Sequence, residues 1–233
     1  MYLKCIFMLR EMYYKIERVF PFINILRILY LKLTHKKPKR YNYLFEFIKQ
    51  NKCKQIMEIG VWNGFHALQM IKAAQEASPF ARIKYFGFDL FENFNITNKL
   101  NGTKIPSSLA VIENKLKKTG AEINLYKGYT QDTLWAFPYI YTDQMDFIFI
   151  DGGHSRKTIA TDWFNIQELM DDKTIVIFDD YWNRIGAGCK TLIDNLDRDK
   201  FNVEILPVVD KFKKDWGVLE IRFVKVQRRQ NAS

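Results

Sequence analysis

Short apolar runs in this 233-residue sequence repeatedly end in an acidic residue or a glycine. The run at 54–60 ends in Glu58 and Gly60, Gly64 follows where a helix is expected to begin, and the next run ends in Asp89. A strand-end carboxylate can accept the hydroxyl hydrogens of a ribose, and glycines let the backbone approach a ligand closely. The pattern therefore predicts a cofactor site at the carboxyl edge of a parallel sheet.

The glycine spacing separates this loop from the dinucleotide-binding fingerprint. Gly60 and Gly64 stand in a G-x-x-x-G pattern, not in the G-x-G-x-x-G pattern that grips a pyrophosphate. A nicotinamide cofactor is therefore disfavoured. Alternative interpretations are a tight strand-to-helix turn for the glycines and a loop cap for Asp89.

The next apolar run leads into Gly128, Tyr129 and Thr130. At the end of a neighbouring strand, these residues would place a ring and a hydroxyl beside an adenine. A turn with a purely structural role is the alternative.

Two later apolar runs end in acids and a histidine. Asp151 and His154 follow the first of them, and Asp179 and Asp180 follow the second. Carboxylates that face an open pocket suit magnesium, which prefers oxygen ligands. His154 could act as a base near neutral pH, and a hydrogen bond to the backbone at a helix start is the alternative.

A regular alternation of strand-like and helix-like segments must position these residues. Beyond residue 41, β-branched or aromatic runs alternate with amphipathic segments, as parallel β-α-β units require. The predicted fold is α/β, a Rossmann-like, doubly wound and mostly parallel seven-stranded sheet with an antiparallel last strand. Strands are expected at 54–60, 83–89, 122–127, 145–150, 173–178, 201–206 and 217–226, and helices at 41–50, 64–77, 106–119, 130–137, 156–170 and 187–197.

The composition, with 48% hydrophobic and 27% charged residues, is that of an ordinary globular protein. Cys5, Cys53 and Cys189 form no C-x-x-C pair, so a reducing, cytoplasmic compartment is expected. The formal charge of +10 belongs to residues 1–54, which hold 13 Lys and Arg against 3 Glu. The remaining residues are neutral overall, which argues against a nucleic-acid surface there.

Residues 1–40 are predicted to form a basic amphipathic helical extension, separate from a domain at 41–233. Apolar residues recur at helical spacing up to Pro21, and a basic cluster of Lys32, Lys36, Lys37, Lys39 and Arg40 ends the segment. No run is long enough to span a bilayer, and a signal-peptide pattern is absent. The extension either binds an anionic membrane surface, giving a peripheral location at the inner face, or packs on the domain or on a second subunit of a homo-oligomer.

The order of these motifs resembles that of class I S-adenosylmethionine-dependent methyltransferases, in particular the small-molecule O-methyltransferase branch that includes macrocin O-methyltransferase. The similarity covers about residues 41–226 and lies in Glu58-Ile-Gly, Phe88-Asp89, Gly128-Tyr-Thr, Ile150-Asp-Gly-Gly-His154 and Phe178-Asp-Asp180. Arg156 departs from the family, in which an aromatic residue is common at that position. Contacts to the methyl acceptor near Arg156 therefore cannot be carried over.

The resemblance implies S-adenosylmethionine as the cofactor and a role for each motif. Residues implied to bind the cofactor are Glu58, Gly60 and Gly64 at the methionine part, Asp89 at the ribose, Gly128, Tyr129 and Thr130 near the adenine, and Asp151. Metal-dependent members hold Mg²⁺ at positions that match Asp151, Asp179 and Asp180. Two catalytic routes follow: Mg²⁺ activates a hydroxyl beside Asp151, or His154 accepts the proton without a metal.

The expected function is O-methylation of a small molecule, a sugar or a glycolipid hydroxyl. One alternative is a non-catalytic nucleotide-binding module that is recruited to a membrane. The other is a nucleic-acid methyltransferase, which the neutral charge beyond residue 54 disfavours.

Overall fold

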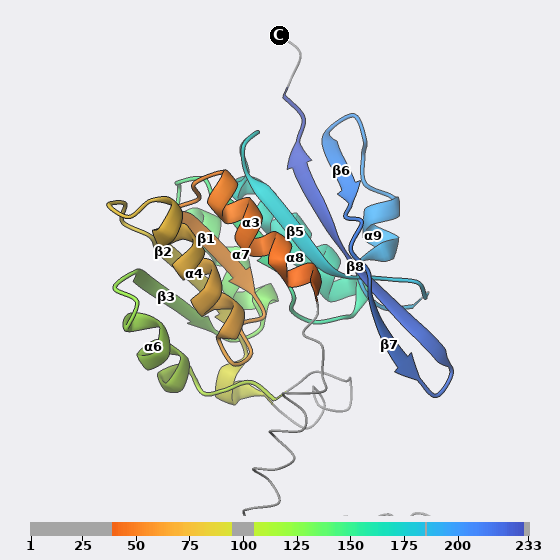
Figure 1. Cartoon of the computed structure of the whole chain (residues 1–233), viewed down its shortest axis with the longest axis horizontal. Helices are drawn as coiled ribbons and strands as arrows, with labels where there is room; N and C mark the ends of the chain where they lie inside the picture. The colour runs from red at the N-terminus through yellow and green to blue at the C-terminus, as the bar shows by residue number, and fades with distance from the viewer. Residues whose placement is uncertain (1–38, 95–104, 185, 231–233) are drawn as a thin grey trace, which may run out of the picture. The chain divides into compact units, whose positions relative to one another are not determined.

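An eight-stranded sheet organises the residues that the computed structural model describes, which are 39–94, 105–184 and 186–230 (Figure 1). The strand order is β3-β2-β1-β4-β5-β8-β6, and β7 pairs with β8. Strands β1 to β5 are parallel, and β8 runs antiparallel to β5, β6 and β7. The predicted α/β fold with a mostly parallel sheet is confirmed.

The elements follow the predicted alternation. In chain order they are η1 (Lys39–Tyr41), α3 (Asn42–Gln50), β1 (Gln55–Ile59), α4 (Phe65–Ala77), β2 (Lys84–Asp89), η2 (Phe91–Asn93), α6 (Leu109–Lys117), β3 (Glu122–Lys127), α7 (Thr130–Ile140), β4 (Phe147–Ile150), α8 (Arg156–Ile166), η3 (Gln167–Leu169), β5 (Ile175–Trp182), α9 (Lys190–Asp194), β6 (Phe201–Ile205), β7 (Asp210–Lys214) and β8 (Gly217–Arg228).

Helices cover both faces of the sheet and create two apolar cores. One core packs α3, α4 and α6 on one face, and the other packs α7, α8 and α9 on the opposite face (Figure 1). All four residues of β4 are buried because this central strand is covered from both sides. The strand order reverses between β1 and β4, and ligands of open α/β sheets bind at such a point.

The structure differs from the sequence prediction at three main places. Strand β5, expected to end at 178, continues to Trp182, so Asp179 and Asp180 lie within it. Asp210–Lys214 forms β7, an additional strand that makes a hairpin with the start of β8, so the sheet has eight described strands instead of seven. The helix expected at 187–197 is reduced to Lys190–Asp194.

The predicted amphipathic extension lies outside the described residues except for Lys39 and Arg40. Among the helices of the described segments, none is both long and apolar enough to cross a bilayer.

Candidate active site

Gly60 joins the tips of β1, β2 and β4. Its backbone N–H donates to the Phe88 carbonyl at 2.8 Å, and the Asp151 N–H donates to the Ile59 carbonyl at 2.8 Å. Gly60 has a φ of +96°, and a Cβ at this position would lie 2.2 Å from the carbonyl oxygen of Asp151. Three predicted site residues, Gly60, Asp89 and Asp151, therefore stand at adjoining strand ends, and only glycine fits this contact.

Asp89, the last residue of β2, holds the loop after β1. Its Oδ2 accepts from the Trp62 N–H at 2.7 Å, and its Oδ1 accepts from the Phe91 N–H at 3.2 Å. The predicted loop cap is therefore present. Since each carboxylate oxygen has two lone pairs, these bonds leave acceptor capacity for ribose hydroxyls, and the ribose role stays a prediction.

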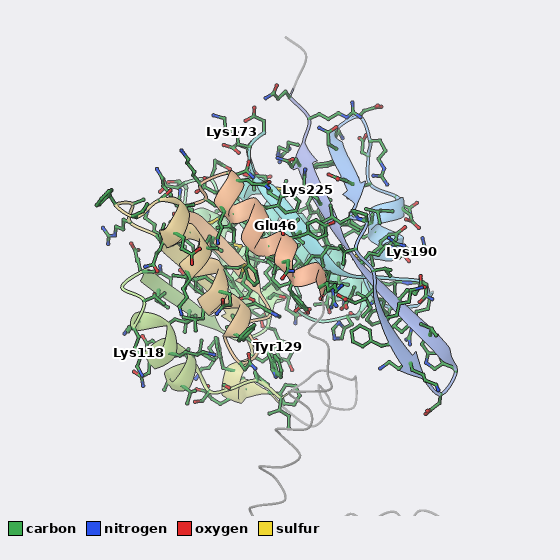
Figure 2. The ribbon with its side chains drawn as sticks, in the orientation of Figure 1. Glu46, Lys118, Tyr129, Lys173, Lys190 and Lys225 are labelled. Atoms are coloured by element: carbon green, nitrogen blue, oxygen red, sulfur yellow. The ribbon has the colours of Figure 1, made fainter. Side chains whose placement is uncertain are left out.

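The loop after β3 lies beside Asp89. The Gly128 N–H donates to the Asp89 carbonyl at 2.9 Å, and α7 begins at Thr130. Tyr129 is 42% exposed, and Figure 2 shows it at the edge of the molecule where β1 and β3 end. The three residues predicted to lie near an adenine thus share an edge with Asp89.

Gly64 is the N-cap residue of helix α4. It has a φ of +65° and, as a glycine, offers no side-chain capping hydrogen bond. Glu58 takes a different position from the predicted one. Its carboxyl is buried and accepts a hydrogen bond from the Tyr85 hydroxyl, beneath the loop. Burial raises the pKa of Glu58 to about 8, although the bond from Tyr85 opposes this shift. We therefore do not include a contact between Glu58 and the methionine part of the cofactor in the proposed site.

The pKa of Glu58 predicts a pH-dependent stability. The protonated carboxyl is favoured in the folded chain, so its contribution is complete below the ordinary pKa of 4.5 and is lost as the pH rises through about 8. We expect the free energy of unfolding to fall more steeply over this window in the wild type than in Glu58→Gln, which keeps only the contribution of other buried carboxyls such as Asp162, whose pKa burial raises to about 6. Urea unfolding of both proteins across the window measures the difference, and parallel pH profiles would contradict the prediction.

The end of β5 turns Asp179 and Asp180 towards different partners. The pairing of β5 with β8 is irregular between Phe178 and Tyr181, and Asp180 has a φ of +63°. A bulge of this kind redirects side chains near the end of a strand. Asp179 faces Arg40 and Tyr41, whereas Asp180 faces His154 and Trp182.

Asp179 forms a buried ion pair with Arg40. The guanidinium Nε and Nη2 donate to its Oδ1 and Oδ2 at 3.0 and 2.8 Å, and the Tyr41 hydroxyl donates to Oδ2 at 3.0 Å. Burial and the neighbouring Asp180 raise the pKa of Asp179, and Arg40 opposes this shift. Sequence reasoning missed this pair because it assigned Arg40 to the basic extension, 139 residues away from its partner.

The predicted magnesium site at Asp151, Asp179 and Asp180 is not assembled. Within the described residues, no group of three His, Cys, Asp or Glu side chains is arranged to hold a metal ion. The physical reason is that Asp179 is bonded to Arg40 and Asp180 is bonded to His154. The residues present therefore do not fit the three-carboxylate metal site that the resemblance implied.

His154 and Asp180 form a side-chain pair between the tips of β4 and β5. The His154 Nδ1 hydrogen-bonds the Asp180 Oδ2, and the indole N–H of Trp182 donates to Asp180 Oδ1 at 2.9 Å. The His154 side chain is 31% exposed, and that of Asp180 is 11% exposed. A carboxylate that accepts from Nδ1 selects one imidazole tautomer, in which Nε2 is the basic nitrogen. This arrangement can remove a proton from a hydroxyl group.

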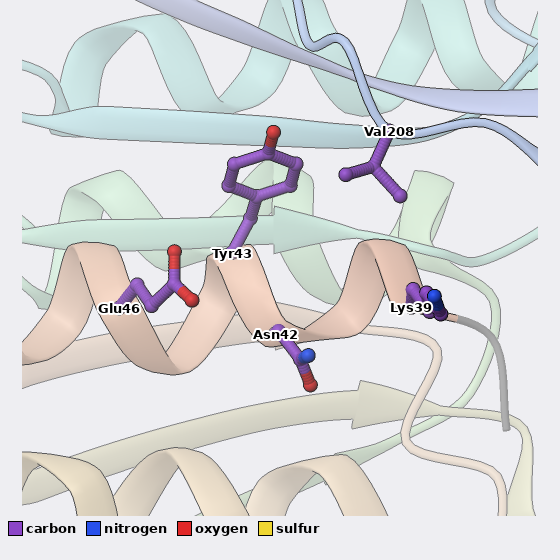
Figure 3. A pocket seen from close by; sticks show the side chains of 5 residues that line it. All are labelled: Lys39, Asn42, Tyr43, Glu46 and Val208. Carbon is purple, nitrogen blue, oxygen red and sulfur yellow. The ribbon is translucent and has the colours of Figure 1, made fainter.

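A pocket of about 200 Å³ lies at the start of α3 (Figure 3). Its lining consists of Lys39, Asn42, Tyr43, Glu46 and Val208. None of them stands at the carboxyl end of a parallel strand, where an α/β sheet binds its cofactor. We therefore assign the site from the strand tips and not from this pocket.

Comparisons with known proteins agree with this fold. The methyltransferase-domain family matches residues 57–181. No curated protein matches the chain. The SAH-bound O-methyltransferase from Bacillus cereus is a similar solved structure, with a TM-score of 0.55 and 13% identity over 89% of this chain and 88% of that one.

Two further solved structures share the fold at low identity. TomG, an O-methyltransferase of tomaymycin synthesis from Streptomyces achromogenes in complex with SAM, has a TM-score of 0.55 and 11% identity over 86% of this chain and 95% of that one. SAH-bound PaMTH1 from Podospora anserina has a TM-score of 0.55 and 15% identity over 84% of this chain and 80% of that one.

The family match spans more than half of the chain and includes the strand tips that carry Gly60, Asp89, Asp151 and Asp180. This chain therefore belongs to the methyltransferase-domain family, and it has the Rossmann-like fold of the solved methyltransferases named above.

Proposed function

We propose that this enzyme methylates a hydroxyl group of a small molecule, a sugar or a glycolipid, and that His154 accepts the hydroxyl proton. The observation that carries the proposal is the His154–Asp180 pair. It stands at the tips of β4 and β5, and β4 lies beside β1 in the sheet. A base is therefore adjacent to the strand ends where we place the cofactor.

The cofactor site in this proposal consists of the strand tips of β1, β2, β3 and β4. Asp89 would accept the ribose hydroxyls, and Gly60 and Gly64 would shape the loop below the methionine part. Gly128, Tyr129 and Thr130 would lie near the adenine, with Asp151 beside them. When bound, S-adenosylmethionine supplies an electrophilic methyl group on a sulfonium.

The chain itself must orient the acceptor and take its proton. Transfer to a hydroxyl forms an oxygen–carbon bond, breaks the sulfonium–methyl bond and releases one proton. Asp180 would stabilise the imidazolium that forms on His154, because its carboxylate already hydrogen-bonds Nδ1. Trp182 holds the other oxygen of Asp180 and so fixes the carboxylate plane.

The test is methyl transfer from radiolabelled S-adenosylmethionine to a panel of phenols, sugars, glycolipids and RNA. We expect label in at least one hydroxyl acceptor. We also expect His154→Gln to reduce the rate by about 10²- to 10⁴-fold while the affinity for S-adenosylhomocysteine stays unchanged. Removal of a general base slows the reaction without removing a cofactor contact.

Three results would contradict the proposal. If RNA bases become labelled and none of the hydroxyl compounds does, the alternative of a nucleic-acid methyltransferase is favoured. A His154→Gln variant with the wild-type rate would exclude His154 as the base, whatever the acceptor. Cofactor binding without transfer to any compound of the panel would favour the non-catalytic module.

The role of residues 1–40 stays a prediction, as do the homo-oligomer and a location at the inner membrane face. Arg40 is 4% exposed and pairs with Asp179, so it cannot contribute to a membrane surface. Of the basic cluster predicted to bind anionic headgroups, only Lys32, Lys36, Lys37 and Lys39 therefore remain as candidates.

A further inference from the structure

Arg40 brings a positive charge from the start of the described chain to the end of β5. Its side chain is 5% exposed, and its two contacts with Asp179 form a bidentate pair. Its third nitrogen, Nη1, donates to Asp210 Oδ2 at 3.0 Å. A bidentate guanidinium–carboxylate pair is among the stronger and more directional charged contacts in proteins.

The surroundings of Arg40 hold it in one position. Asp210 also accepts from the backbone N–H groups of Lys39 and Arg40 at 2.9 and 3.1 Å. The guanidinium lies over the ring of Tyr41 at 4.5 Å and over the ring of Phe223 at 5.4 Å. The Tyr41 ring in turn stacks on His66 at a centroid distance of 3.9 Å. Backbone, charge and ring contacts thus all fix the same side chain.

The hydrogen bonds to Asp179 fill its acceptor capacity. Oδ1 accepts from Arg40 Nε and from the Asp180 N–H, the latter at 2.6 Å. Oδ2 accepts from Arg40 Nη2 and from the Tyr41 hydroxyl. A carboxylate has about four lone-pair positions, and here four donors occupy them. A metal ion could bind Asp179 only by displacing one of these donors.

We propose that the Arg40 guanidinium is a built-in counter-cation for Asp179 and takes the place of a divalent cation at the end of β5. Asp179 is then a structural partner of Arg40 and not a metal ligand. For catalysis, which rests on the function proposed above, the consequence is that His154 and Asp180 act without a divalent cation. Methyl transfer would therefore persist in EDTA.

Manganese binding tests the proposal without knowledge of the acceptor. The full chain, saturated with S-adenosylhomocysteine, is titrated with Mn²⁺, and the free ion is followed by electron paramagnetic resonance. We expect no stoichiometric binding to the wild type. In Arg40→Met the Asp179 carboxylate loses its counter-charge, so we expect one Mn²⁺ per chain, bound at least about tenfold more tightly than by the wild type.

Matched variants identify the ligand. Arg40→Lys keeps the positive charge and is expected to behave like the wild type. Adding Asp179→Asn to Arg40→Met is expected to remove the new manganese site. Thermal unfolding shows whether each variant is folded, and if Arg40→Met is not, the titration of the wild type decides alone.

The proposal is overturned if the wild type binds one Mn²⁺ per chain and Asp179→Asn abolishes that binding. It is also overturned if folded Arg40→Met binds no more Mn²⁺ than the wild type, because Arg40 would then not be what excludes the cation. The manganese titrations test this proposal independently of the proposed function. The proposed function is tested by the methyl-transfer rates of the wild type and of His154→Gln.

Discussion

Replacing Asp89 with alanine is expected to weaken the binding of S-adenosylhomocysteine by about 100-fold or more. Two hydrogen bonds from ribose hydroxyls to an ionised carboxylate contribute about 1.5–3 kcal/mol each. Alanine removes both acceptors and also the bonds that Asp89 accepts from the N–H groups of Trp62 and Phe91. Isothermal titration calorimetry of the variant and the wild type measures the change in affinity.

Asp146 provides a matched control for Asp89. Like Asp89, it accepts from two backbone N–H groups, here those of Lys54 at 2.6 Å and Gln55 at 2.9 Å, both through Oδ2, but it does so at the amino ends of β1 and β4. Asp146→Ala should lower the free energy of unfolding to a similar extent and leave the affinity unchanged. If Asp89→Ala binds as tightly as the wild type, or if both variants lose affinity equally, the ribose assignment is wrong.

Gly60→Ala is expected to lower the free energy of unfolding by about 3 kcal/mol or more. A side chain at a positive φ costs about 1–3 kcal/mol, and an overpacked contact costs a further 1–3 kcal/mol or so. Here the new Cβ would lie 2.2 Å from the Asp151 carbonyl oxygen, so the tips of β1 and β4 must separate. We expect weaker cofactor binding as well, because Gly60 and Asp151 then no longer adjoin. Urea unfolding and calorimetry measure the two effects.

Gly120 separates backbone strain from the contact with Asp151. It has a φ of +78°, and no atom lies within 4 Å of the Cβ that alanine would add. Gly120→Ala should therefore cost only about 1–2 kcal/mol and leave cofactor binding intact. Equal losses of stability in the two variants would show that the close approach to Asp151 is not what requires glycine at position 60.

The central sheet could be predicted from the sequence because each strand carries a local signal. The strands expected at 83–89 and 122–127 end at the same residues in the structure, Asp89 and Lys127. Strand β7 was missed because Asp210–Lys214 consists of one Asp and three Lys around a single Phe. Such a strand is defined by its pairing with β8 and not by an apolar pattern of its own.

The strand tips of the candidate site were equally predictable, but the partners of their side chains were not. Glu58 on β1 is paired with Gly87 on β2, and Tyr85, two residues before Gly87, donates to its carboxyl from a diagonal position, so the bond depends on a strand register that the sequence does not specify. Arg40 and Asp179 are far apart in the sequence, and a cluster of basic residues gave no sign that one of them is buried. Burial of a charge depends on tertiary packing. The local sequence around Asp179 therefore predicted a metal ligand and did not indicate the ion pair with Arg40.

A crystal structure of the chain with S-adenosylhomocysteine tests the proposed cofactor site most directly. We expect both ribose hydroxyls to lie within hydrogen-bonding distance of the Asp89 carboxylate, between the tips of β1 and β2. The adenine should lie beside Gly128, Tyr129 and Thr130. A ligand bound elsewhere, or a ribose that makes no contact with Asp89, would contradict the proposed site.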